Sequence, residues 1–145
     1  MGAGSVTGMR SPTELTSEFR RSGLKVTPQR QLLFRLLHGN VTHPTAEALY
    51  ETASDLMPGI SLRTVYQTLN DLCTMGELRS VSLPGSPTRF DPNVGEHHHA
   101  VCEGCGEVRD VYVDSLDLDR VHGYEGFVAT SASIVFGGRC EVCSA

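Results

Sequence analysis

Two Cys-x-x-Cys pairs restrict the fold of this 145-residue chain more than any other feature. Cys102 and Cys105 form the first pair, Cys140 and Cys143 form the second, and 34 residues lie between them. We expect each pair to lie at a tight turn, where four thiolates in tetrahedral arrangement suit a structural Zn²⁺ ion. Two disulfides and a redox dithiol are the alternatives. Residues 1–15 contain no apolar segment typical of a secretion signal, which favours reduced thiols and zinc.

The segment that carries these cysteines has the pattern of a small mixed domain. Alternating apolar residues predict strands over residues 97–103 and 107–113 and a long strand over residues 127–136. A short helix is expected over residues 114–122. About 50 residues bury little apolar surface, and domains of this size often need a staple such as a metal ion. We therefore expect residues 92–145 to form a small α/β domain built around zinc.

Histidines and aspartates form a second cluster in the same part of the chain. His97 and His99 alternate on a predicted strand and so point to the same side, with Asp91 upstream and Asp110 downstream. Two imidazoles with carboxylates suit Fe²⁺, Mn²⁺ or Zn²⁺ better than Cu⁺, which prefers sulfur. A solvent-exposed histidine run is the alternative interpretation. His43, judged by its position alone, flanks the start of a helix.

The N-terminal part of the chain has the signals of several helices followed by a hairpin. Thr27-Pro28 and Ser61 are typical helix starts, and Gly76 is a typical stop. Apolar spacing predicts helices over residues 13–22, 27–38, 45–50 and 61–76, then short strands over residues 78–83 and 88–91 around a turn at residues 84–87. The order predicts a winged helix-turn-helix domain over residues 11–91, after a flexible arm over residues 1–10. The fold class is therefore α+β.

The last helix before the hairpin is the candidate recognition helix of this winged domain. Its expected outward side chains donate to base edges and phosphates or contact a thymine methyl group. They are Arg63, Thr64, Tyr66, Gln67, Thr68 and Asn70. A solvated helix face without DNA is the alternative. Cys73 on the same helix is interpreted as a buried small apolar residue.

The net charge of −5 is the sum of two unlike parts of the chain. Residues 1–90 carry a balance of +2, and residues 91–145 carry a balance of −7. An acidic total argues weakly against nucleic acid as a partner, whereas this asymmetry indicates that the two parts have different roles. No apolar run approaches the roughly 20 residues that span a bilayer, so no membrane partner is expected.

Several motifs together resemble the ferric uptake regulator (Fur) family over about residues 12–143. They are GLKVTPQR at 23–30, HPTA at 43–46, SLRTVY at 61–66, RFD at 89–91, HHH at 97–99 and the two cysteine pairs. The resemblance implies a cytoplasmic, homodimeric, metal-dependent repressor. Its N-terminal winged helix would bind a palindromic operator in double-stranded DNA, and its C-terminal domain would form the dimer.

Within that family, the chain is most similar to the peroxide-sensing branch. The similarity implies a regulatory Fe²⁺ or Mn²⁺ ion beside the structural Zn²⁺, held by three histidines and two aspartates. Those positions are His43, Asp91, His97, His99 and Asp110. With Fe²⁺ bound, peroxide would oxidise His43 or His97, and the protein would release DNA. A further site seen in iron-uptake members would need His98, Asp117 and a histidine where this chain has Ser131, so that site is expected to be incomplete.

Specific DNA contacts follow as a hypothesis from the same resemblance. Lys25 and Arg30 would contact the backbone or the minor groove, and Arg63, Thr64, Tyr66 and Gln67 would contact the major groove. Three alternatives remain: an iron, manganese or zinc uptake regulator without peroxide chemistry, a non-haem iron enzyme with a two-histidine and carboxylate site, and a zinc-stapled dimerisation module.

Overall fold

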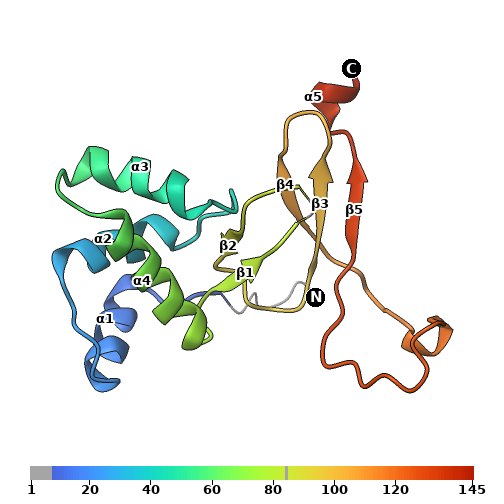
Figure 1. Ribbon diagram of the computed structural model, residues 1–145, viewed down its shortest axis with the longest axis horizontal. Coiled ribbons are helices and arrows are strands. Elements are labelled where there is room, and N and C mark those ends of the chain that lie inside the picture. The colour runs from blue at the N-terminus through green and yellow to red at the C-terminus, as the bar shows by residue number, and fades with distance from the viewer. Residues whose placement is uncertain (1–7, 84) are drawn as a thin grey trace. The chain divides into compact units, whose positions relative to one another are not determined.

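The computed structural model describes residues 8–83 and 85–145, which form two compact units that meet in sequence at Gly95 and Glu96. Figure 1 shows that helices dominate the first unit and strands dominate the second. The predicted α+β class is therefore confirmed. The assignment of residues 11–91 to DNA binding and of residues 92–145 to dimerisation stays a prediction. No helix in the described ranges combines the length and apolarity that a membrane crossing requires.

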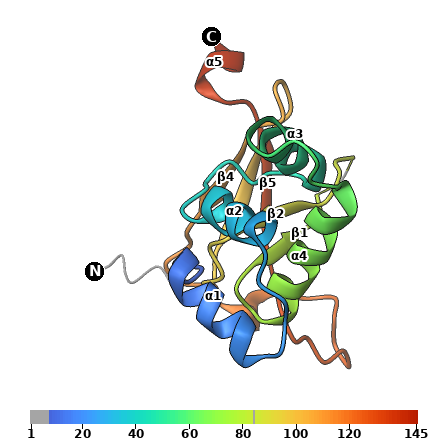
Figure 2. The ribbon, with the colours of Figure 1, turned by 90° about the vertical axis from the view of Figure 1, so that its left-hand side faces the viewer.

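The first unit begins with four helices, each of which starts where a hydroxyl side chain caps it. The capping residues Ser11, Thr27, Thr45 and Ser61 each accept a hydrogen bond from a backbone N–H in the first helical turn. The helices are α1 (Pro12–Arg21), α2 (Pro28–Leu37), α3 (Ala46–Leu56) and α4 (Leu62–Thr74). Helix α2 packs against all three other helices, and Figure 2 shows it beside them.

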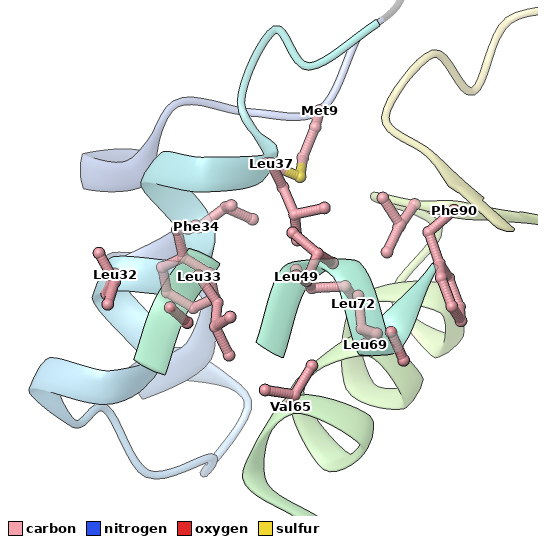
Figure 3. Packing of buried hydrophobic residues seen from close by; sticks show 14 of the residues in the cluster. Met9, Leu32, Leu33, Phe34, Leu37, Leu49, Val65, Leu69, Leu72 and Phe90 are labelled. Carbon is pink, nitrogen blue, oxygen red and sulfur yellow. The ribbon is translucent and has the colours of Figure 1, made fainter. Parts of the chain in front are cut away.

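The core of the first unit lies between these helices (Figure 3). The rings of Phe19 and Phe34 meet edge to face, with their centroids 4.8 Å apart. Leu69 and Leu72 on α4 are completely buried. Because α4 buries one side only, its other side stays available to a partner.

The start of the described chain is packed rather than flexible. Residues 1–7 of the expected arm lie outside the described residues, but Met9 is only 6% exposed and belongs to the core. Its N–H donates to the carbonyl of Pro92 at 2.9 Å, and Arg10 forms ion pairs with Glu18 and Glu77. The prediction of a flexible arm extending to residue 10 is wrong at residues 8–10, because Met9 packs in the core and Arg10 forms ion pairs.

A two-stranded antiparallel sheet forms the wing. Strand β1 (Arg79–Val81) pairs with β2 (Arg89–Asp91), so that Ser80 lies opposite Phe90. Pro84 of the expected turn lies outside the described residues, and Ser86 N–H donates to the Leu83 carbonyl across that turn. The wing ends on Asp91, which places a candidate ligand at the end of a strand.

The second unit is built on a three-stranded sheet in the order β4-β3-β5. The central strand β3 (His98–Cys102) pairs antiparallel with β4 (Val108–Val111) and parallel with β5 (Val135–Gly138). A single turn of 3₁₀ helix, η1 (Leu118–Arg120), lies between β4 and β5, and the short helix α5 (Glu141–Ser144) follows β5.

Two predictions for the segment between β4 and β5 are wrong. The helix expected over residues 114–122 is reduced to η1, and the strand expected over residues 127–136 begins only at Val135. The apolar side chains of the segment have nothing in this unit to pack against, since Phe127 is 72% and Val128 86% exposed. Helices and strands this short gain most of their stability from a buried face, so the apolar pattern alone does not produce them.

We predict that replacing Met9 by alanine lowers the free energy of unfolding by about 2 kcal/mol, because truncating a buried methionine leaves a cavity. The matched control Met9→Leu keeps the volume and should cost less than about 1.5 kcal/mol. Urea unfolding followed by circular dichroism measures both. An unchanged Met9→Ala variant would show that the residue is not packed in solution.

Candidate metal centres

The four cysteines of the two Cys-x-x-Cys pairs meet in the second unit. Their sulfur atoms all lie within 4.8 Å of one another. Cys102 ends β3, whereas Cys140 and Cys143 belong to the start and body of α5. The parallel pairing of β3 with β5 places Cys102 opposite Gly138, so the two pairs are brought together by the register of the sheet.

Backbone N–H groups surround one sulfur of this cluster. Gly104, Cys105 and Cys140 direct their N–H groups at the sulfur of Cys102 over distances of 3.3 to 3.5 Å. These donors, that of Cys105 first, lower the pKa of Cys102 to about 6. The neighbouring sulfurs of Cys102 and Cys140 raise the pKa of Cys143 to about 12. Several thiolates cannot remain charged so close together without a cation, so this donor set fits a thiophilic divalent metal.

Gly104 has a steric role in the cysteine cluster. A Cβ atom at this position would lie 2.8 Å from the sulfur and 3.0 Å from the Cβ of Cys143. The first distance is shorter than real Cβ contacts and the second is tighter than most of them, so a side chain at residue 104 would displace Cys143.

The first unit contributes a buried histidine–aspartate pair. His43 Nε2 lies 3.2 Å from Asp91 Oδ2, and each residue is 1% exposed. His43 has a φ of 54°, a conformation that is uncommon outside glycine. Arg89 Nη1 donates to the His43 carbonyl at 3.1 Å, and Phe90 N–H donates to the Pro44 carbonyl at 2.9 Å. The wing strand thus supports the loop that presents His43.

The second unit contributes two histidines that converge on one carboxylate. Asp110 Oδ1 lies 3.2 Å from His97 Nε2 and 3.6 Å from His99 Nε2. His99 is paired with Asp110 across β3 and β4, and His97 and His99 are both buried with their ring centroids 4.7 Å apart. Buried imidazoles and a carboxylate oxygen with this geometry are donors suited to a divalent cation.

The residues of the further site that was expected to be incomplete have other roles in the described chain. His98 Nδ1 accepts the N–H of Ile134 at 2.9 Å, and Asp117 caps η1 by accepting the N–H of Asp119. Ser131 is exposed. Among the described residues, no group of three or more metal-binding side chains includes His98 or Asp117.

The candidate DNA contacts divide into exposed and buried side chains. Arg63, Tyr66 and Gln67 on α4 are exposed, and so is Lys25. Thr64 is half-buried near Ser61, and Thr68, which was expected to face outward, is wholly buried. The expectation for Thr68 is wrong because its methyl group joins the core while its hydroxyl donates to the Thr64 carbonyl at 2.8 Å.

Three supporting residues were missed by the sequence analysis. Glu47 on α3 accepts the hydroxyl of Tyr66 at 2.5 Å, which raises the pKa of that phenol. Asp71 pairs with Arg30 at 3.0 Å, and Arg89 donates to the loop at His43. The RFD motif had pointed to Arg89. Glu47 and Asp71 are single polar residues on helices, and nothing in the sequence pattern around them indicated a supporting role.

The chain is similar to known proteins over most of its length. The sequence model described as the ferric uptake regulator family matches residues 21–136. Proteins named peroxide-responsive repressor PerR are 33% identical in Staphylococcus aureus and 36% identical in Staphylococcus epidermidis, each over 132 residues. These matches cover 90% of this chain and 89% and 88% of the relatives.

Solved structures agree with the sequence comparisons. The Vibrio cholerae ferric uptake regulator matches with a TM-score of 0.66 and 28% identity over 87% of this chain and 99% of its own. The Campylobacter jejuni peroxide stress regulator matches with a TM-score of 0.60 and 26% identity, over 93% of this chain and 100% of its own. The Helicobacter pylori ferric uptake regulator shares the fold with a TM-score of 0.72 at 19% identity, over 96% of this chain and 97% of its own.

We predict that Gly104→Ala weakens metal retention at the cysteine cluster, because the added methyl group overlaps Cys143. The matched control is Gly138→Ala, whose Cβ would meet no atom within 4 Å. The rate at which a chromogenic chelator removes metal from each variant measures the effect. Equal rates for the two variants would contradict the steric role.

Proposed function

Because this chain belongs to the ferric uptake regulator family, we propose that it is a metal-dependent transcriptional repressor that responds to peroxide. Members of the family are transcriptional regulators, so the chain is not an enzyme and the non-haem iron oxygenase alternative is set aside. The observation that carries the proposal is the buried set of imidazoles and carboxylates, in a chain whose relatives are named peroxide-responsive repressors.

The cysteine cluster is proposed to hold a structural Zn²⁺ ion. Cys102, Cys105, Cys140 and Cys143 supply four sulfur donors and leave no position for a substrate, as in closed structural sites. Such a metal would connect the end of β3 with α5. The function proposed for this centre is stability of the second unit rather than sensing.

The histidines and aspartates are proposed to form the regulatory centre for Fe²⁺ or Mn²⁺. His43 with Asp91 provides two donors, and His97, His99 and Asp110 provide three. We propose, from the resemblance to the peroxide-sensing branch, that all five residues serve one regulatory ion. Binding of Fe²⁺ or Mn²⁺ would then favour one arrangement of the winged domain over others. Such a change is a population shift driven by a ligand.

The peroxide response is proposed to act through loss of a ligand. The imidazole itself would supply the two electrons that reduce H₂O₂: the O–O bond breaks, one oxygen atom replaces hydrogen on a ring carbon, and the other leaves as water. Bound Fe²⁺ would act as the catalyst of this cleavage. The imidazole of His43 or His97 would gain one oxygen atom on a ring carbon and lose its ability to serve as a strong nitrogen donor. The two ligand sets would then separate, and the winged domain would return to its unconstrained state.

DNA binding is proposed to use α4 in a homodimer. Arg63, Tyr66 and Gln67 are exposed on one helix whose other side is buried in the core. Two such helices at about 34–36 Å would enter successive major grooves of a palindromic operator. Lys25 is proposed to contact the phosphate backbone, and the protein is proposed to work in the cytoplasm, where thiols stay reduced.

The dimer is proposed to form through the second unit. Many of its large apolar side chains are exposed, and exposed apolar side chains that gather in one patch mark interaction sites. They are Tyr112, Val113, Leu116, Leu118, Val121, Phe127, Val128, Val135, Phe136 and Val142. A second copy of the chain would cover these side chains and supply the packing that residues 114–134 lack.

A regulator of metal uptake without peroxide chemistry is the second candidate. Its support is the likeness to the Vibrio cholerae ferric uptake regulator at 28% identity. Iron, manganese or zinc level would be the signal in that case. The two candidates share every ligand and differ only in whether a histidine is oxidised.

We predict that H₂O₂ added to the Fe²⁺-loaded protein adds one oxygen atom to the peptide containing His43 or His97 and abolishes DNA binding. The Mn²⁺-loaded protein is the control and should retain both its mass and its DNA binding. Peptide mass spectrometry and fluorescence anisotropy measure the two effects. An unmodified Fe²⁺ form that continues to bind DNA would favour the metal-uptake candidate.

We predict that Asp110→Asn weakens Mn²⁺ binding by more than about 10-fold, because it removes the charge between His97 and His99. The matched control is Asp114→Asn, which neutralises an exposed carboxylate just beyond β4. Titration calorimetry with Mn²⁺ compares the two variants. Equal affinities would exclude Asp110 as a ligand, and a retained complement of zinc would show that the unit is folded.

A further inference from the structure

A partly buried ion pair connects α4, the candidate recognition helix, to the rest of the first unit. Near the start of α2, Arg30 Nη2 lies 3.0 Å from Asp71 Oδ2 on α4. Arg30 Nη1 also donates to the carbonyl of Lys25 at 3.2 Å, and the guanidinium carbon lies 5.4 Å from the ring centroid of Phe19 on α1. One side chain therefore contacts α1, α4 and the loop between α1 and α2.

These contacts favour a structural role for Arg30 over the DNA contact that the sequence analysis expected. The Arg30 side chain is only 14% exposed, and the carboxylate of Asp71 already balances its charge. A phosphate contact requires a cation that reaches the surface and displaces counterions. A planar guanidinium that pairs with a carboxylate and lies over an aromatic ring is instead typical of a structural arginine.

The ion pair lies beside a candidate base-reading residue. Asp71 follows Gln67 by four positions on α4, so the two side chains occupy the same helix face. Arg30, Gln67, Asn70 and Asp71 line one small open pocket on the first unit. A change in the ion pair would therefore act next to Gln67 on the same face of α4.

We propose that the Arg30–Asp71 ion pair positions α4 for base reading and that Arg30 does not contact phosphate. The inference rests on the proposed DNA-binding function. Since the pair is close to neutral overall, it contributes to the affinity for a specific sequence and not to the non-specific attraction for DNA. The same guanidinium fixes the backbone of Lys25, whose own exposed ammonium stays available to DNA.

The direction in which Asp71→Asn changes the affinity for DNA tests this proposal. Removing a negative charge beside a DNA-binding surface should tighten binding if only electrostatics matter. If the ion pair positions α4, Asp71→Asn should instead weaken binding to a specific duplex by about 10-fold, a loss of the size expected for one misplaced base contact. Affinity for an unrelated duplex of equal length should not fall, and Asp71→Glu should restore part of the specific affinity.

The experiment uses the Mn²⁺-loaded full chain and a duplex that the wild-type protein selects from a random library. Fluorescence anisotropy gives the affinity and its dependence on salt for Asp71→Asn, Arg30→Gln and the double variant. Asp55→Asn, which neutralises an exposed carboxylate on α3, is the matched control. Far-ultraviolet circular dichroism confirms that each variant is folded.

We expect both single variants to bind the selected duplex more weakly and the double variant to bind it no more weakly than they do. The salt dependence of binding should equal that of the wild-type protein. Tighter specific binding by Asp71→Asn, or a salt slope that falls by about one in Arg30→Gln, would overturn the proposal and show a phosphate contact. If Arg30→Gln does not fold, the Asp71 variants alone decide between these outcomes. A wild-type protein that selects no duplex would overturn the proposed function itself.

Discussion

The second unit depends on its cysteine cluster, because its apolar core is very small. Among its described residues, the buried apolar side chains are Cys102 and Val108, while buried His97 and His99 are polar. A sheet of three short strands with so little buried surface needs a covalent or coordinate link. A metal held by the four sulfurs would provide that link, and the register of β3 with β5 brings the two cysteine pairs together.

The register of β3 with β4 arranges the candidate regulatory ligands of the second unit. Once β3 and β4 are paired, His99 lies opposite Asp110, and His97 approaches the same carboxylate oxygen. In the first unit, the wing strand has the corresponding role, since it carries Asp91 and also hydrogen-bonds the loop that presents His43. Each half of the proposed regulatory centre is thus a product of strand pairing.

The sequence predicted most of the first unit because its signals are local. Helix starts at Thr27, Thr45 and Ser61 depend on a hydroxyl that caps a backbone only three residues away. Residues 114–134 were mispredicted because an apolar pattern forms a helix or strand only where another surface covers it. Thr68 was assigned to the wrong face because it lies at the border between the buried and exposed sides of α4.

By itself, the sequence determined the chemistry of the donors, since four cysteines, three histidines and two aspartates have ligand preferences that do not depend on their surroundings. It also determined the order of the helices and strands in the winged domain. Only the tertiary structure decided that Asp110 lies between two imidazoles and that Arg30 faces Asp71 instead of solvent. Those arrangements join residues that lie far apart in the chain. The register of a sheet or the packing of a helix decides which of them meet, and local sequence does not encode that register or packing.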